Sequence, residues 1–237
     1  MDYTQDLYFS DIFNFSDFVE SGYLSDCEIR IHPKDGDSNY TVVKGHKLVL
    51  ANSSLFFNNT FTAGMEESQT GIVDTYVNPY NLLPRVINWM YTGRIEFSVD
   101  ELMPLLNISH NYGILVLEKE LLAQLDEVAD ENTVLGLVKK CYEDEMSKEL
   151  QILIPYIAKF FDKLSLSKLS EELDVATFAK AIGLTQLSTK EKVLKITEFL
   201  QDWQPSMEEK MALFNAFSPD ETRLKEFAMK HNARWLP

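Results

Sequence analysis

Cysteine is scarce in this chain of 237 residues, which contains only Cys27 and Cys141, 114 positions apart. Two cysteines are too few for the disulfide framework of a small secreted protein or for a four-ligand zinc site of cysteines. We therefore expect reduced thiols and an intracellular protein of the cytoplasm or the nucleus.

Positive charge is also scarce. Twenty-two basic residues against 37 acidic residues give a formal net charge of -15 and a pI near 4.7. Because such a field repels phosphate backbones and anionic lipid, we expect neither nucleic acid nor a membrane as a partner. The first fifteen residues carry three aspartates and no lysine or arginine, unlike a secretory signal or a transit peptide. No run approaches the roughly 18 apolar residues of a membrane span.

The sequence motifs of enzymes are missing as well. Neither cysteine has a histidine at the spacing that a thiolate nucleophile requires, and the four histidines stand far apart. The sequence contains no G-x-S-x-G, H-E-x-x-H, P-loop or Rossmann glycine pattern. We expect no catalytic residues, no cofactor and no metal. His46 is interpreted as a hydrogen-bonded structural histidine, since no cluster of metal-ligand residues surrounds it in the sequence.

The chain does have the 45% hydrophobic content of a folded protein, and its first half alternates strand patterns with helices. Apolar residues recur at steps of three and four from Tyr8 to Val19, which predicts an amphipathic helix over residues 11–20 with an aromatic stripe. Residues 27–31 alternate apolar and polar side chains, which predicts a strand in a hairpin with residues 40–43. The other predicted elements are a strand over 72–77 and helices over 48–61 (with a break near 52–53), 82–92, 101–109 and 116–125.

The second half shows helical spacing almost throughout, so we place a domain boundary there, with domains over residues 1–125 and 126–237. Three helix starts combine a serine cap with a glutamate three positions later: Ser188 with Glu191, Ser206 with Glu209, and Ser218 with Glu221. These signals predict a stack of antiparallel helical hairpins with short connections.

Four stretches together resemble the BTB (POZ) family over about 100 residues: LSDCEI at 24–29, GHKLVLANSSLF at 45–56, WMYTG at 89–93 and the leucine-rich helices over 102–117. The second half, through a segment over 191–203, is similar to the BACK domain that follows BTB in some members. The resemblance implies an α+β fold: a BTB domain with a small sheet and surrounding helices, followed by an all-α BACK domain of helical hairpins.

The resemblance also implies which residues form interfaces. In family members that recruit cullin-3, a hydrophobic-x-Glu step lines the cullin groove at a position that here follows the helix ending at Phe61. Met65 and Glu67 fill this step, and the resemblance implies that Phe61 and Tyr112 also belong to the cullin-binding site. The alternative is that Glu66 and Glu67 belong to a solvated loop.

The first helix of the family packs against a second subunit, which implies a homodimer interface made by Ile12, Phe13, Phe15, Phe18 and Val19. The alternative is that these rings are buried against their own domain.

Asp26 and Lys47 match the positions of a charged pair near the dimer seam. The alternative is a strand-end aspartate that caps the next turn and an exposed lysine.

We therefore expect a homodimeric adaptor that binds the N-terminal domain of cullin-3 and acts as, or antagonises, a substrate adaptor of a ubiquitin ligase. The sequence contains no kelch repeats, MATH domain, ankyrin repeats or zinc fingers, so the client protein is unknown. The alternative is a scaffold that self-associates, or that binds other BTB proteins or non-cullin peptides, without ligase function.

Overall fold

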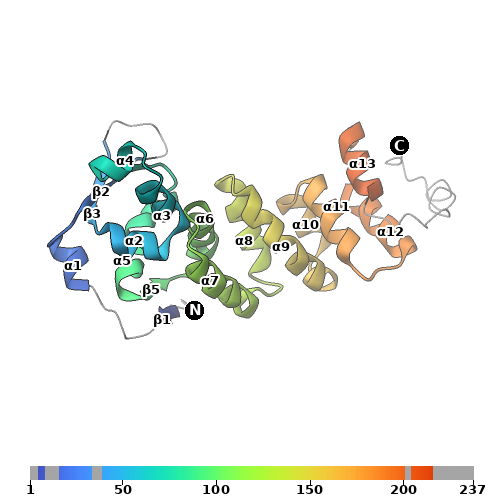
Figure 1. The fold of residues 1–237 in the computed structure, drawn as a ribbon. Helices are drawn as coiled ribbons and strands as arrows, with labels where there is room; N and C mark the ends of the chain where they lie inside the picture. The colour runs from blue at the N-terminus through green and yellow to red at the C-terminus, as the bar shows by residue number, and fades with distance from the viewer. Residues whose placement is uncertain (1–4, 9–15, 34–38, 201–203, 216–237) are drawn as a thin grey trace. The chain divides into compact units, whose positions relative to one another are not determined.

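The computed structural model describes residues 5–8, 16–33, 39–200 and 204–215 (Figure 1). The chain divides into two compact units, Met1–Val128 and Ala129–Pro237.

The first unit contains a three-stranded sheet with the strand order β3-β2-β4. The central strand β2 (Cys27–Ile31) pairs antiparallel with β3 (Thr41–Gly45) and parallel with β4 (Ile72–Thr75). Every second residue of β2 is buried, which confirms the predicted alternation and places the apolar face of the sheet on the core.

Helices supply the rest of the core of this unit, where Phe57, Leu83, Ile87 and Leu105 have no solvent-exposed surface. The helices are α1 (Ser16–Ser21), α2 (Lys47–Ser53), α3 (Leu55–Thr62), α4 (Glu66–Thr70), α5 (Leu83–Thr92), α6 (Leu102–Tyr112) and α7 (Leu115–Val128), with 3-10 turns η1 (Pro79–Asn81) and η2 (Val99–Glu101). α5 ends at Gly93, whose φ of 68° is a left-handed conformation that suits glycine.

The predicted break in the helix over 48–61 separates α2 from α3 at Ser54. Its extended backbone interrupts the helix, and its hydroxyl accepts the N–H of Phe57 at 3.2 Å. The same hydroxyl donates to the carbonyl of Tyr112 at 2.6 Å, so the helix start is tied to the end of α6. The serine therefore satisfies an otherwise unpaired amide at the start of α3.

Tyr8, the first residue of the apolar pattern from which the first helix is predicted, does not belong to a helix. Residues Gln5–Tyr8 form strand β1, which pairs antiparallel with β5 (Arg94–Phe97) in a separate two-stranded sheet. Neither strand is predicted by the sequence pattern, because each has four residues and the partners lie far apart in the chain.

In the described part of the second unit, every regular element is helical, as the sequence predicts. The elements are α8 (Val134–Glu143), α9 (Ser147–Phe160), η3 (Phe161–Lys163), α10 (Leu166–Glu172), α11 (Val175–Leu184), α12 (Thr189–Leu200) and α13 (Met207–Asn215). α8 packs on α9, α9 on α11, α10 on α12 and α11 on α13. The α+β unit followed by a helical unit confirms the predicted fold class.

Two of the three predicted capping boxes are present, and the third, at Ser218, lies outside the described residues. Glu191 accepts the main-chain N–H of Ser188 at 2.9 Å, and the hydroxyl of Ser188 accepts the N–H of Glu191 at 3.4 Å. Ser206 and Glu209 make the same reciprocal bonds at 2.7 and 3.2 Å. Each box satisfies two amides at a helix start.

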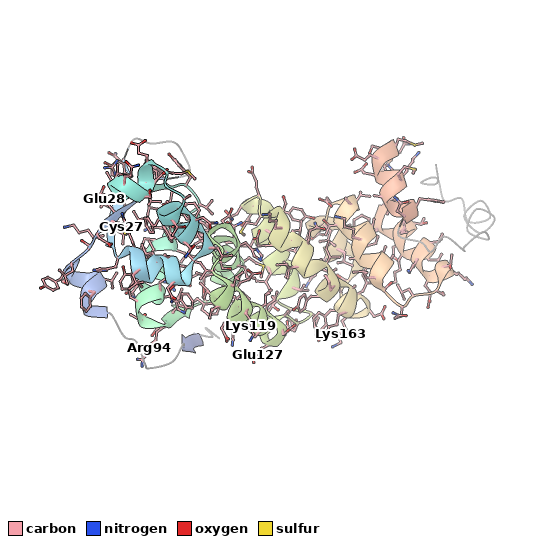
Figure 2. The ribbon with its side chains drawn as sticks, in the orientation of Figure 1. Cys27, Glu28, Arg94, Lys119, Glu127 and Lys163 are labelled. Carbon is pink, nitrogen blue, oxygen red and sulfur yellow. The ribbon has the colours of Figure 1, made fainter. Side chains whose placement is uncertain are left out.

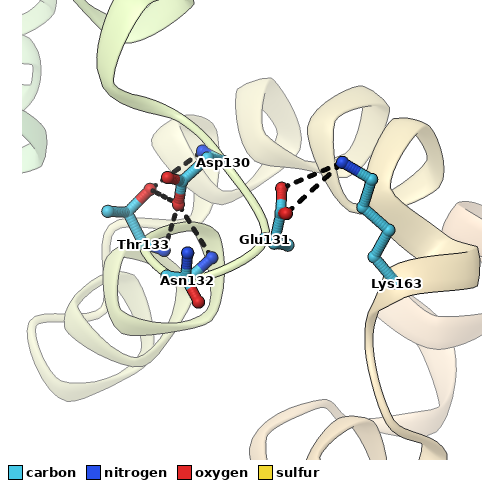
Figure 3. A network of polar contacts seen from close by, with 5 residues as sticks. All are labelled: Asp130, Glu131, Asn132, Thr133 and Lys163. Carbon is cyan, nitrogen blue, oxygen red and sulfur yellow. Dashed lines mark hydrogen bonds and ion pairs between the residues drawn. The ribbon is translucent and has the colours of Figure 1, made fainter.

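A polar turn begins the second unit (Figure 3). The Asp130 carboxylate accepts the main-chain N–H groups of Asn132 and Thr133 at 2.8 and 2.9 Å, and the Thr133 hydroxyl accepts the N–H of Asp130 at 2.9 Å. The hydrogen bond from the main-chain N–H of Asn132 is the main cause that lowers the pKa of Asp130 below its ordinary value. An ion pair between Glu131 and Lys163 at 3.3 Å ties this turn to η3. The turn thus fixes where α8 starts.

Candidate interaction site

The hydrophobic-x-Glu step lies at the start of α4, on the surface of the first unit. Met65 is the residue before the helix and is 56% exposed, while Glu66 is exposed and Glu67 is half-buried in the first turn. Glu66 and Glu67 therefore belong to the first turn of a short helix, and Met65 is its cap. A flexible thioether beside a carboxylate can fill an apolar recess of a partner and accept a hydrogen bond at its rim.

Phe61 lies on α3, in the turn that precedes this step, and is half-buried. Its ring is nearly parallel to that of Phe57, with 6.0 Å between the ring centroids. Phe61 therefore connects the surface near Met65 to the aromatic core.

Tyr112 does not line the surface, and the prediction of a direct partner contact from its ring is wrong. The residue is 3% exposed, its ring is parallel to Phe57 at 6.0 Å, and its hydroxyl donates to the carbonyl of Val77 at 3.0 Å. Burial raises the pKa of Tyr112 to about 12. Tyr112 is a core residue that supports α3 from the inside.

Asp26 and Lys47 are brought together, but through the main chain of the lysine. The Asp26 carboxylate accepts the main-chain N–H of Lys47 at 2.7 Å, at the first residue of α2. The Lys47 ammonium donates instead to the carbonyl of Ser68 on α4, at 2.9 Å. The aspartate therefore acts as the alternative interpretation states, by capping the next turn, while the lysine is partly buried. The adjoining Cys27 and Glu28, labelled in Figure 2, begin β2.

Of the predicted dimer residues, Ile12, Phe13 and Phe15 lie outside the described residues. Phe18 is 36% exposed and Val19 is half-buried, both on α1. The Phe18 ring makes an edge contact with His46, at 5.7 Å between ring centroids. Phe18 thus keeps part of its apolar surface in water while it anchors α1 to the domain.

Sequence reasoning missed three other exposed apolar residues at this end of the domain. Tyr23, Leu24 and Leu48 are 66%, 69% and 82% exposed. Leu24 has a φ of 59°, an unfavourable conformation for a leucine, and no sequence signal indicates it. Phe18 lies 6.4 Å from Tyr23 between ring centroids, and we call Phe18, Tyr23, Leu24 and Leu48, from α1 to the start of α2, the α1–α2 patch. Several large apolar side chains in water at one end of a domain are typical of an interaction surface.

His46 holds the segments of the α1–α2 patch together, as a structural histidine. Its Nε2 lies 2.8 Å from the carbonyl of Tyr23, and its Nδ1 lies 3.1 Å from the hydroxyl of Tyr91. Because a carbonyl only accepts, Nε2 carries the proton that is donated to it. The Tyr91 hydroxyl also accepts the main-chain N–H of His46 at 2.8 Å, and burial raises the pKa of Tyr91 to about 12.

Both cysteines are free and buried, one in each unit. Burial raises the pKa of Cys27 and of Cys141 to about 12, so neither thiol has the thiolate character of a nucleophile. Within the described ranges, no three or more side chains of histidine, cysteine, aspartate or glutamate are placed to hold a metal ion. The described helices also include none with the length and apolar content to cross a bilayer.

Comparison with known proteins defines the class of the first unit. Residues 15–128 match the BTB/POZ domain family, and this part of the chain is a BTB/POZ domain, a protein-interaction module. Kelch-like protein 7 of Gallus gallus is 30% identical over 95 residues, which are 40% of this chain and 16% of that protein, and the Homo sapiens protein gives the same values. Kelch-like protein 13 of Mus musculus is 27% identical over 89 residues, which are 38% of this chain and 13% of that protein. The match thus spans about a sixth of the length of the Kelch-like protein 7 relatives.

Proposed function

We propose that the protein is a homodimeric BTB adaptor that binds the N-terminal domain of cullin-3 and contributes binding rather than chemistry. The observation that carries the proposal is the exposed Met65 beside Glu67 at the start of α4. The family resemblance implies a cullin groove at this step, and the related Kelch-like proteins agree with an adaptor role. Phe61 adds apolar surface at the edge of the groove, and the buried Tyr112 supports it.

The homodimer would be formed by α1 together with the α1–α2 patch. A two-fold interface uses the same surface on both subunits, and its centre buries apolar side chains that are exposed in the single subunit. Leu48 is the most exposed large apolar residue of the patch, so it is the first candidate for the centre of the interface.

The second unit would act as a BACK domain over residues 126–237 that extends the partner contact and holds a client. The client protein is recruited by the helical unit itself or by a further partner, and a form that occupies cullin without a client would antagonise the ligase. We place the protein inside the cell, in the cytoplasm or the nucleus, where cullin ligases work.

Titration calorimetry of the full chain with a purified cullin-3 N-terminal domain tests the proposal. We expect a complex below about ten micromolar that is weakened on the order of tenfold by Met65→Ala and by Glu67→Ala. The matched control is Glu66→Ala, which removes the same charge at the variable position of the step and is expected to bind like the wild type. A dimer that forms no complex at tens of micromolar would instead identify a self-associating scaffold.

A further inference from the structure

We propose that Lys47 is a positioning residue for the partner groove: its ammonium holds α4, and thereby Met65 and Glu67, in the orientation that a partner meets. The inference rests on the proposed function for the identity of the partner. The role differs from that of a charged partner of Asp26, because the Lys47 ammonium donates to the Ser68 carbonyl on α4.

The helix beside the groove residues is short, and polar contacts make up much of its attachment. α4 has five residues, and none of them is buried. At its end, the carbonyl of Gly71 accepts the N–H of Glu28 at 2.8 Å, which fixes the end of the helix to β2. The Ser68 carbonyl, in the middle of the helix, receives the ammonium of Lys47 at 2.9 Å. A helix without buried side chains depends on such polar anchors for its orientation.

Lys47 is held in place at three points: its main-chain N–H, its Cε atom and its ammonium. The main-chain N–H is held by Asp26 at 2.7 Å, so the starting point of the side chain is fixed. The Cε atom lies 3.4 Å from the place that a Cβ on Gly71 would occupy, so the stem runs against the end of α4. The ammonium lies 5.6 Å from the centre of the Phe61 ring, within the range of a cation–π interaction.

Glycine at position 71 is what lets these groups approach so closely. Its φ is 71°, and a Cβ there would lie 2.7 Å from the main-chain oxygen of Asp26. The Asp26 carboxylate and the Lys47 ammonium therefore act at different points, the first on α2 and the second on α4. Both contacts lie next to Gly71, where α2, α4 and the start of β2 meet.

Removing the ammonium frees α4 to sample other orientations, and only a fraction of the molecules then presents Met65 and Glu67 correctly. The apparent affinity for a partner falls by that fraction. A hydrogen bond from a charged group is stronger than a neutral one, and partial burial of Lys47 protects it from solvent. We expect an affinity loss on the order of tenfold.

The experiment compares Lys47→Met, which keeps an apolar stem out to Cε but removes the ammonium, with Lys47→Arg, which keeps a cationic donor. The matched control is Lys44→Met, which removes the same charge from an exposed lysine on β3. Two quantities are measured on the full chain: the Kd for the cullin-3 N-terminal domain, and hydrogen exchange of the amides in α4, β2 and α5. K47M is expected to weaken binding about tenfold and to raise exchange in α4 alone. K47R and K44M are expected to stay near the wild type.

The exchange measurement separates failure of this inference from failure of the proposed function. If the wild type does not bind cullin-3, faster exchange confined to α4 in K47M still supports the role of Lys47. Unchanged α4 exchange in K47M would overturn the inference, as would equal losses in K47M and K47R. Lys47→Gln, with a head one bond shorter, serves as a second variant. If K47M and K47Q both raise exchange equally in β2 and α5, Lys47 serves general stability and the proposal is refuted.

Discussion

Replacing Leu48 with aspartate tests the proposed dimer most directly. Leu48 is 82% exposed in the single chain, so a dimer centred on it would remove most of that surface from water. Full burial of a leucine is worth about 2 kcal/mol, and the exposed fraction therefore corresponds to about 1.6 kcal/mol per subunit. Because a two-fold interface contains two copies, the loss is about 3 kcal/mol per dimer, a rise of about 200-fold in the dissociation constant.

The fold itself is expected to tolerate this substitution. Leu48 lies in the first turn of α2, where a negative charge interacts favourably with the helix dipole. Sedimentation equilibrium of Leu48→Asp is expected to show single chains at micromolar concentration, where the wild type has twice the mass of one chain. The matched control is Leu184→Asp, the same change at an exposed leucine at the end of α11.

Two results would refute the reasoning. One is a Leu48→Asp protein that remains a dimer at the concentrations where the wild type does. The other is a loss of the dimer in Leu184→Asp as well, because that would indicate a general response to added charge. Thermal unfolding of both variants, within a few degrees of the wild type, would show that the monomer is intact.

Three further predictions concern stability and reactivity. Tyr112→Phe removes the bond to the Val77 carbonyl and is expected to lower the free energy of unfolding by about 1 kcal/mol, and Tyr112→Ala by about 3–5 kcal/mol, in urea titrations. Asp130→Ala is expected to cost about 1 kcal/mol at pH 7 in the same assay. Since the folded-state pKa of Asp130 lies below its unfolded value, its contribution is complete above the unfolded value and is lost as the pH falls through the folded value. The gap between wild type and variant therefore closes in acid. Cys27 and Cys141, each with a pKa of about 12, are expected to react with a thiol reagent at pH 8 only as the protein unfolds, and rapid labelling of the native protein would contradict their burial.

The elements that the sequence predicts correctly are those specified by local physics. The two-residue period of β2 and the serine–glutamate boxes of α12 and α13 each depend on residues within a few positions of one another. β1 and β5 are not predicted because each has only four residues, too few for the alternation in β5 to stand out, and because their pairing joins residues about 90 positions apart.

The candidate site shows the same division between local and non-local information. The resemblance points to Met65 and Glu67, which the structure places at the start of α4, but it does not indicate that Tyr112 is buried among rings of another helix. The charges of Asp26 and Lys47 suggest a pair, yet a nearby amide competes for the carboxylate and a distant carbonyl for the ammonium. Which hydrogen-bond partner each charged group takes depends on the folded geometry, so it cannot be predicted from the sequence.

The pairing of β1 with β5 has a consequence for synthesis of the chain. Gln5 pairs with Phe97, 92 positions later, so the first strand leaves the ribosome long before its partner exists. At about 5–20 residues per second, the delay is roughly 5–18 seconds. During that time β1 has no partner within its own chain, so the two-stranded sheet closes only after residues 94–97 have been made, and the N-terminal segment joins the domain late in its synthesis.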